Sequence, residues 1–193
     1  MLITVSGPAG SGKSTLAAAL AEELGYDHIS GGDIFRDLAA ERGLSPLELN
    51  RLAEEDDQID RDLDNRLRTL AREAEALVLE SRLAGWMAGD YADFRLWLDA
   101  PLAVRAERIA EREGKSVEQA SEETNARAES EATRYREYYG IDIDDLTIYD
   151  LVINTARWSP EGVLALALAG INSHDENSDE GKLPVTGVAY DFG

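Results

Sequence analysis

The feature that most constrains this chain is a glycine-rich run close to its N-terminus, between an apolar segment and an amphipathic one. Leu2–Ser6 is short and apolar, and Gly7–Ser14 fits the pattern G-x-x-x-x-G-K-[ST]. Lys13–Leu24 then carries leucines four residues apart and ends at Gly25, which predicts a helix. In this strand–loop–helix order, successive backbone N–H groups can surround phosphate oxygens at the start of a helix. The run therefore predicts a cradle for the phosphates of a nucleoside triphosphate.

The side chains of this loop divide the work. We expect Lys13 to reach the β- and γ-phosphates and the Ser14 hydroxyl to bind Mg²⁺, while Thr15 adds a contact at the α-phosphate. GTPase switches usually carry D-x-x-G and N-K-x-D as well, and the sequence contains neither. This makes a phosphoryl-transfer enzyme the favoured function. The predicted ATP-binding residues are Gly7, Pro8, Ala9, Gly10, Ser11, Gly12, Lys13, Ser14 and Thr15.

Further along the chain, short apolar segments alternate with helical ones. Expected strands are Leu2–Ser6, a short segment just before Ser30, Ala76–Glu80, Arg95–Asp99 and Leu151–Asn154; expected helices include Lys13–Leu24, Pro101–Glu113, Val117–Tyr139 and Pro160–Ala169. Strands separated by helices predict an α/β fold: a P-loop NTPase domain with three α/β/α layers around a central parallel five-stranded sheet.

Segments outside this alternation suggest the domain organisation. We expect one kinase domain over residues 1–171, because 193 residues are few for two domains. A charged helical insertion at about 31–75 would bind the acceptor, and a short lid is expected at about 113–127. Residues 172–193 are polar and acidic, which is typical of a flexible tail.

The composition excludes several kinds of partner. Asp and Glu number 39 against 19 Lys and Arg, a net charge of −20, which disfavours nucleic-acid binding and favours a high-salt cytoplasm. The sequence has no cysteine and two histidines, so thiolate sites are absent and a histidine metal site is disfavoured. The longest apolar run, Val163–Ala169, is too short to span a membrane. We expect a cytoplasmic monomer that acts on small molecules.

Two polar segments follow predicted strands and could bind a second, phosphorylated ligand. Ser30, Asp33 and Arg36 lie at a glycine-containing turn that opens a helix. Glu80 ends a strand, where it could order a magnesium-bound water, and Arg82 could pair with an acceptor phosphate. Local ion pairs are the ordinary alternative for both arginines, but the phosphate loop favours a role in the acceptor site.

Arginines also gather on two helices joined by a polar turn. One face of the first helix carries Arg105, Arg108 and Arg112, and one face of the second carries Arg127, Glu131 and Arg134. Such faces could close over the transferring phosphoryl group, neutralise its charge and exclude water, with Glu131 holding the arginines. A solvated ion-pair network is the alternative. In so acidic a chain, we favour function for Arg127 and Arg134.

From Met1 to about Ile171 the chain resembles the nucleoside monophosphate kinases, and most closely the archaeal type of cytidylate kinase. The matching segments are "ITVSGPAGSGKST", "ISGGDIFRDLAAERG", "ESRLAGWM", "WLDAPLAVRAERIAEREGKS", "RAESEATRYREYYGIDIDD" and "YDLVINTARWSPEGV". The resemblance implies Mg²⁺-dependent transfer of the ATP γ-phosphoryl group to CMP or dCMP. The chain differs from the family pattern in two places. Ser81 stands where the family often has Gly, and Gly31-Gly32 stands where the family often has Ser, Thr or Ala followed by Gly.

The resemblance implies that Gly7–Thr15 binds ATP, that Arg36 and Arg82 hold the monophosphate, and that Arg127, Glu131 and Arg134 form an arginine–acid–arginine set in the lid. Taken with the residue patterns above, the candidates are Lys13, Arg82, Arg127 and Arg134 for catalysis; Ser30, Asp33, Arg36 and Arg82 for the acceptor; Glu131, Arg105 and Arg108 for support of the lid; and Ser14 and, through water, Glu80 for the metal. Base specificity would come from the insertion, where Asp60, Asp64 and Arg66 are candidates for base contacts or for structural salt bridges.

Two kinds of alternative stay open at this stage. Within the kinases, these are an adenylate or uridylate kinase and a small-metabolite kinase of the shikimate type. From a different class, a nucleotide-binding regulator or ATPase would need neither acceptor arginines nor a lid.

Overall fold

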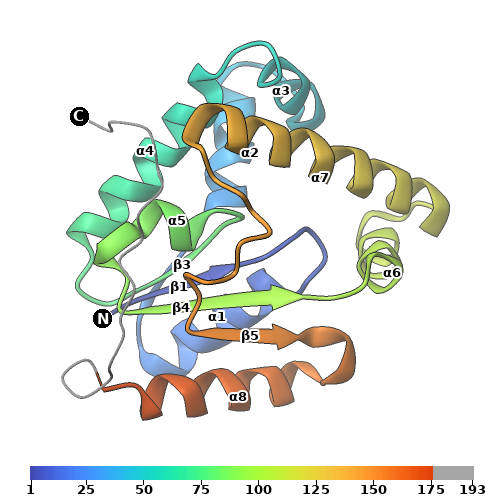
Figure 1. The fold of residues 1–193 in the computed structure, drawn as a ribbon. Coiled ribbons are helices and arrows are strands. Elements are labelled where there is room, and N and C mark those ends of the chain that lie inside the picture. Colours follow the sequence, from blue (N-terminus) through green and yellow to red (C-terminus); the bar gives the residue numbers. More distant parts are fainter. Residues whose placement is uncertain (176–193) are drawn as a thin grey trace.

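The computed structural model describes residues 1–175, which form a parallel sheet covered by helices on both faces (Figure 1). The sheet has five strands in the order β2-β3-β1-β4-β5, all parallel. This confirms the predicted α/β fold, and β3 and β4 each begin one residue from the predicted start. The strands are β1 (Leu2–Ser6), β2 (Asp27–Ser30), β3 (Leu77–Glu80), β4 (Phe94–Asp99) and β5 (Leu151–Asn154).

Alternation of side chains along the strands builds two separate cores. Ile3 and Val5 of β1 pack with α1 (Lys13–Leu24) and α8 (Pro160–Ser173) on one face of the sheet. Leu2 packs on the other face with α4 (Gln58–Glu73) and α5 (Ala84–Ala88). Burial of apolar side chains on both faces explains why the strands read as continuous apolar runs.

The insertion between β2 and β3 consists of α2 (Gly31–Glu41), α3 (Pro46–Leu52) and α4. It has a small core of its own, made by Phe35, Leu38, Ala39, Leu49, Ala53 and Ile59. Helix α3 begins at a capping box in which Ser45 and Glu48 bond each other's backbone N–H groups. The insertion is therefore a packed helical unit placed beside the sheet, as Figure 1 shows.

The predicted lid region is a turn between two helices. α6 (Leu102–Glu113) is followed by Gly114, which has a φ of +66°. α7 (Val117–Tyr139) is capped by Ser116, whose side chain accepts a hydrogen bond from the Gln119 N–H. α7 crosses from α6 towards α3 and α4 above the sheet (Figure 1), and near its C-terminal end Tyr135 and Tyr139 enter the core below α4. Two 3₁₀ turns complete the described chain, η1 (Gly89–Tyr91) and η2 (Thr155–Arg157).

The last helix is longer than its pattern indicated. α8 continues to Ser173 instead of ending at Ala169, and the His174 ring packs edge-on against Phe94, with centroids 5.4 Å apart. The expected acidic tail thus begins with helical residues, and from residue 176 it lies outside the described part of the chain. Between residues 1 and 175, no helix has the length and apolarity needed to cross a membrane.

Strand register brings the chemically important loops to one edge of the sheet. Ser30 and Glu80 are paired in the register of β2 and β3, and Asp99 is paired with Asn154 in that of β4 and β5. Because all strands run in the same direction, the segments that follow them emerge together at the carboxyl edge, where ligands of open α/β sheets bind.

Candidate active site

The phosphate loop joins β1 to α1 at this edge, in a backbone shape that needs glycine. Gly7 has a φ of +141°, and a Cβ there would lie 2.1 Å from the Leu98 carbonyl oxygen. Gly10 has a φ of +78°, and its Cβ would lie 2.7 Å from the Arg105 carbonyl oxygen. Neither position accepts a side chain, since the conformation and the space both exclude one. The loop is thus held close to β4 and α6.

Lys13 is the first residue of α1 and is buried beneath the loop. Its Nζ donates to the Pro8 carbonyl oxygen at 3.0 Å. Burial, helped by the positive charge of Arg82, lowers the pKa of Lys13 to about 8, whereas Glu80 and Glu131 act in the opposite direction. The charges that act on Lys13 are thus those of predicted acceptor and lid residues. Ser14 and Thr15, next in sequence, are exposed.

Glu80 ends β3 as a buried carboxylate with spare bonding capacity. Its Oε2 is buried and has no hydrogen-bond partner among the described residues, and the His28 Nε2 of β2 lies 3.9 Å away. A buried carboxylate oxygen without a donor is costly unless a ligand or an ordered water satisfies it. Sequence reasoning did not identify His28 as a neighbour of Glu80, since its place in a four-residue strand gives no signal of function.

The acceptor segment Ser30–Arg36 comprises the N-cap residue of α2 and the nearly two turns that follow it. Ser30 caps the helix by accepting a bond from the Asp33 N–H at 3.4 Å, and Asp33 forms an ion pair with Arg36. The Arg36 side chain is exposed, so its guanidinium is accessible to a ligand. Gly31 packs so tightly that a Cβ there would lie 2.7 Å from the Cβ of Ser81. The two departures from the family pattern therefore face each other, and a glycine at either place leaves room for a side chain at the other.

Arg82, Glu131 and Arg127 form a connected ion-pair cluster between β3 and α7. Glu131 is buried and forms ion pairs with Arg82 through Oε2 and with Arg127 through Oε1, the latter at 2.7 Å. Burial alone would raise the pKa of Glu131, but the two arginines hold it below its usual value. The structure thus brings these three predicted site residues together and keeps Glu131 ionised.

Arg134 lies one turn beyond this cluster and faces the acceptor insertion. Its Nε donates to Asp60 at 2.7 Å and its Nη1 to the Ser130 hydroxyl at 2.7 Å. Arg134 and Asp60 are both buried. Arg134 thus joins α7 to α4, with no direct bond to Glu131 among the hydrogen bonds described for it.

The other two candidates for base contacts lie apart from each other. Asp64 is buried one turn after Asp60 and is hydrogen-bonded to Tyr139, and burial raises its pKa to about 8. Arg66 is half exposed and lies 3.9 Å from Glu41. Within the insertion, buried carboxyls therefore face α7, whereas the candidate arginine lies on the surface.

The first arginine face differs from its predicted arrangement. Arg105 donates to the carbonyl oxygens of Ala100 and Ala9, at 2.9 and 3.2 Å, and Arg108 donates to that of Gly10 at 3.1 Å. Arg112 is exposed and pairs with its neighbour Glu113. Arg105 and Arg108 therefore face the phosphate loop, and the structure does not bring them to the cluster around Glu131. The helical spacing was correct, but the loop lies nearer to α6 than the spacing could indicate.

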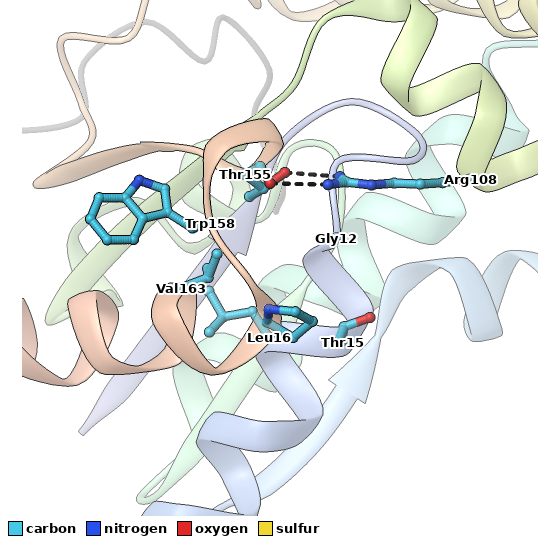
Figure 2. Close-up of a pocket in the computed structure, with 8 residues that line it drawn as sticks. Gly12, Thr15, Leu16, Arg108, Thr155, Trp158 and Val163 are labelled. Carbon is cyan, nitrogen blue, oxygen red and sulfur yellow. Dashed lines mark hydrogen bonds between the residues drawn. The ribbon is translucent and has the colours of Figure 1, made fainter.

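A pocket of about 150 Å³ opens beside the start of α1 (Figure 2). Arg108 and Trp158 enter it from opposite sides, and the Arg108 guanidinium donates to both oxygens of Thr155, at 2.9 and 3.0 Å. Sequence reasoning missed Thr155 and Trp158, although their place directly after the last strand of the sheet is a signal that could have identified them. The lining residues are Gly12, Thr15, Leu16, Arg108, Thr155, Trp158, Pro160 and Val163.

Comparison with solved structures supports the fold. A shikimate kinase from Acinetobacter baumannii is similar with a TM-score of 0.60 and 19% identity, covering 89% of this chain and 93% of its own. A gluconokinase from Sinorhizobium meliloti has a TM-score of 0.59 and 20% identity, over 91% of this chain and 93% of its own. At these identities the likeness shows a shared P-loop kinase fold.

Sequence relatives are much closer. The cytidylate kinase of Natronomonas pharaonis is 68% identical and that of Haloarcula marismortui 66%, each over the full length of both chains. The cytidylate kinase of Pyrococcus horikoshii is 50% identical over 94% of this chain and 93% of its own. A halophilic origin, which the charge indicated, fits the first two relatives. The model of the cytidylate kinase-like family matches residues 2–157, and the chain belongs to that family.

Proposed function

We propose that the protein transfers the γ-phosphoryl group of ATP to CMP, and also to dCMP, giving ADP and the nucleoside diphosphate. One observation carries the proposal: Lys13 of the loop after β1 and the cluster of Arg82, Glu131 and Arg127 beside the neighbouring strand β3 lie at the same edge of the sheet, where a donor and an acceptor phosphate can meet. The full-length identity to cytidylate kinases supports CMP as the acceptor.

In the proposed reaction, an oxygen of the CMP phosphate attacks the γ-phosphorus of ATP. A new P–O bond forms, and the bond between the γ-phosphorus and the β–γ bridging oxygen breaks, with its electron pair leaving on ADP. The acceptor phosphate is already a nucleophile near neutral pH, so no general base is needed. The protein contributes alignment and stabilisation of negative charge.

The cationic side chains divide between the two substrates. Lys13 would bind the β- and γ-phosphates, and Arg36 and Arg82 would hold the acceptor phosphate, the second from a position already fixed by Glu131. Arg127 is bound to the same carboxylate and would contact the transferring group. Arg134 would join them from α7, which requires it to exchange its bond with Asp60 for a phosphate. Glu131 acts through the arginines and is a positioning residue.

The residues present also fit Mg²⁺, which would neutralise phosphate charge during the transfer. Ser14 offers an exposed hydroxyl at the start of α1, and the buried Oε2 of Glu80 has no partner among the described residues, as expected of a group that holds a metal-bound water. Mg²⁺ usually keeps several waters and binds few protein ligands, so this sparse set is typical.

The pocket beside Thr15 would take the donor base. It lies at the start of α1, next to Gly12, and it offers an indole ring and a guanidinium on opposite sides, both of which can stack on a flat heterocycle. We also propose that residues 1–171 act as one kinase domain with an acceptor insertion at about 31–75 and a lid at about 113–127, and that the protein works as a cytoplasmic monomer.

An acceptor panel tests the proposed function. The protein is assayed for ADP release with MgATP in molar KCl and CMP, dCMP, UMP, AMP, GMP or shikimate in turn, and without an acceptor. We expect release to depend strictly on an acceptor and to be fastest with CMP and dCMP. Equal release without acceptor would indicate an ATPase or regulator, and a preference for UMP, AMP or shikimate would overturn the assignment. Lys13→Ala should lower turnover by orders of magnitude in a folded protein.

A further inference from the structure

Three consecutive carbonyl groups of the phosphate loop are held from outside by residues distant in sequence. The Ala9 carbonyl oxygen accepts from Arg105 Nη1 at 3.2 Å, and that of Gly10 accepts from Arg108 Nη1 at 3.1 Å. The Ser11 carbonyl oxygen accepts from the Thr155 hydroxyl at 2.8 Å. The donors come from α6 and η2, on the side of the loop away from Lys13.

Each of these bonds also fixes the direction of the next N–H group. In a planar trans peptide, the C=O of one residue and the N–H of the following residue point in opposite directions. Because the carbonyls of residues 9, 10 and 11 point towards α6 and η2, the N–H groups of Gly10, Ser11 and Gly12 point towards the inside of the loop. The Ser11 N–H and Lys13 Nζ both reach the Pro8 carbonyl oxygen, at 3.3 and 3.0 Å, which marks this inner side.

We propose that Arg105, Arg108 and Thr155 are positioning residues that hold the phosphate cradle in its binding conformation. They orient the backbone N–H groups of the loop towards its inner side without touching the triphosphate. On that side Gly10 and Gly12 offer donors, and the Ser11 N–H is bonded to the Pro8 carbonyl oxygen. This rests on the proposed use of the loop for ATP, and it assigns the α6 arginines a role different from contact with the transferring group.

The chemistry of the three donors suits this role. An arginine guanidinium stays charged at any physiological pH and donates in several directions at once, so Arg105 spans Ala100 and Ala9, and Arg108 spans Gly10 and Thr155. The buried Thr155 hydroxyl accepts from Arg108 at 2.9 Å and donates onward to Ser11, so the two residues form one chain. A loop so rich in glycine pays much conformational entropy when it becomes ordered, and these bonds reduce the part left for ATP to supply.

The test uses Thr155→Val, which removes the hydroxyl at nearly constant shape and charge, and Thr155→Ser, which keeps it. Thr133→Val is the matched control, since that hydroxyl also donates to a backbone carbonyl, of Glu129 at 3.0 Å, but on the exposed side of α7. Inorganic tripolyphosphate probes the cradle alone and adenosine probes the neighbouring pocket alone. Dissociation constants are measured by calorimetry in molar KCl, beside KM and kcat, and circular dichroism verifies folding.

We expect Thr155→Val to bind tripolyphosphate about 5- to 10-fold more weakly, the loss of one hydrogen bond, with a similar rise in the KM for ATP and little change in that for CMP. Thr155 also lines the neighbouring pocket, so adenosine affinity should fall as well, but by clearly less than tripolyphosphate affinity; Thr155→Ser should recover most of the tripolyphosphate affinity, and Thr133→Val should resemble the wild type. Unchanged tripolyphosphate affinity in a folded Thr155→Val protein would overturn the inference, as would an equal loss for adenosine.

Arg105→Gln provides a second route if Thr155→Val does not fold, because Arg105 is half-buried and outside the residues that line the pocket. It should also weaken tripolyphosphate binding and spare adenosine, and failure to do so would refute the inference. Because tripolyphosphate needs no acceptor, these results are independent of the acceptor panel. A protein that binds tripolyphosphate but ignores CMP would refute the proposed function alone.

Discussion

The contact between Gly31 and Ser81 allows a sharp test of how the acceptor loops fit together. Gly31 opens α2 and Ser81 follows β3, and a Cβ added at Gly31 would lie 2.7 Å from the Cβ of Ser81. Real Cβ atoms do not approach so closely, so Gly31→Ala must move one backbone segment against the other. The next residue, Gly32, is a matched control, because the nearest atom to its added Cβ is the flexible Arg36 Nη1 at 3.5 Å.

The expected size of the effect follows from this geometry. Overpacking one methyl group costs about 1–3 kcal/mol, from which the better helix propensity of Ala removes at most about 1 kcal/mol. Gly32→Ala should show only the gain in stability from the better helix propensity of Ala. Ser81→Gly removes the clash but also the bond from the Leu83 N–H to the Ser81 hydroxyl, 3.2 Å long, which contributes about 1 kcal/mol.

A double-mutant cycle measures the contact itself. Urea unfolding in molar KCl is followed by circular dichroism for the wild type, Gly31→Ala, Ser81→Gly and the double variant, with Gly32→Ala beside them. We expect the double variant to be more stable than the sum of the single changes predicts, by about 1–3 kcal/mol, since the contact between the two Cβ atoms exists only when both side chains are present, while the 3.3 Å approach to the Glu80 carbonyl oxygen remains in both Gly31→Ala proteins.

Additive effects would refute the steric account. So would a Gly31→Ala protein as stable as Gly32→Ala, because the two changes differ only in what the added methyl group meets. A positive result would also show that positions 31 and 81 constrain each other, since a glycine at one position leaves more room for a side chain at the other.

Three further predictions rest on charge. Burial lowers the pKa of Lys13 to about 8, and the phosphates of ATP should raise it, so binding at pH 8 should take up roughly half a proton in buffer-dependent calorimetry, and Lys13→Met should abolish the uptake. For Asp64, folding raises the pKa from 3.8 to about 8, so the folded protein binds an extra proton between these pH values. The free energy of unfolding should therefore decrease as the pH rises through this range, by up to about 1.4 kcal/mol per pH unit. Asp64→Asn should remove that slope in urea titrations at pH 5, 6.5 and 8, and an unchanged slope would contradict the assignment. Finally, the net charge of −20 should make the melting temperature rise from low salt to molar KCl, and a protein fully stable at low salt would refute the halophilic adaptation.

Sequence alone predicted the parts of the site that local pattern determines. The phosphate loop needs a fixed order of strand, glycine turn and helix, so Lys13 could be placed at the start of α1. The spacing of Arg105 and Arg108 put them on one helix face, but which loop that face meets depends on how α6 docks, and this is a tertiary property. Thr155 has one local signal, its place directly after the last strand, but its partner could not be predicted, because that partner is a carbonyl 144 residues away in the chain.

Helix α7 shows most clearly that residue spacing predicts which side chains share a helix face but does not predict which residues they contact. Arg127, Glu131 and Arg134 were predicted on one face. Glu131 and Arg134 are buried and Arg127 is partly exposed, and the face divides between two neighbours: Glu131 binds Arg82 after β3, and Arg134 binds Asp60 in α4. One rigid helix therefore contacts both the cluster near Lys13 and the insertion that would hold the acceptor. Since a helix moves as a unit, a shift of the insertion on acceptor binding must also move Glu131, and with it the two arginines that Glu131 positions. For Arg134 to contact a phosphate as proposed, it would first have to leave the buried carboxylate of Asp60, and a phosphorylated ligand would supply the negative charge that replaces that partner.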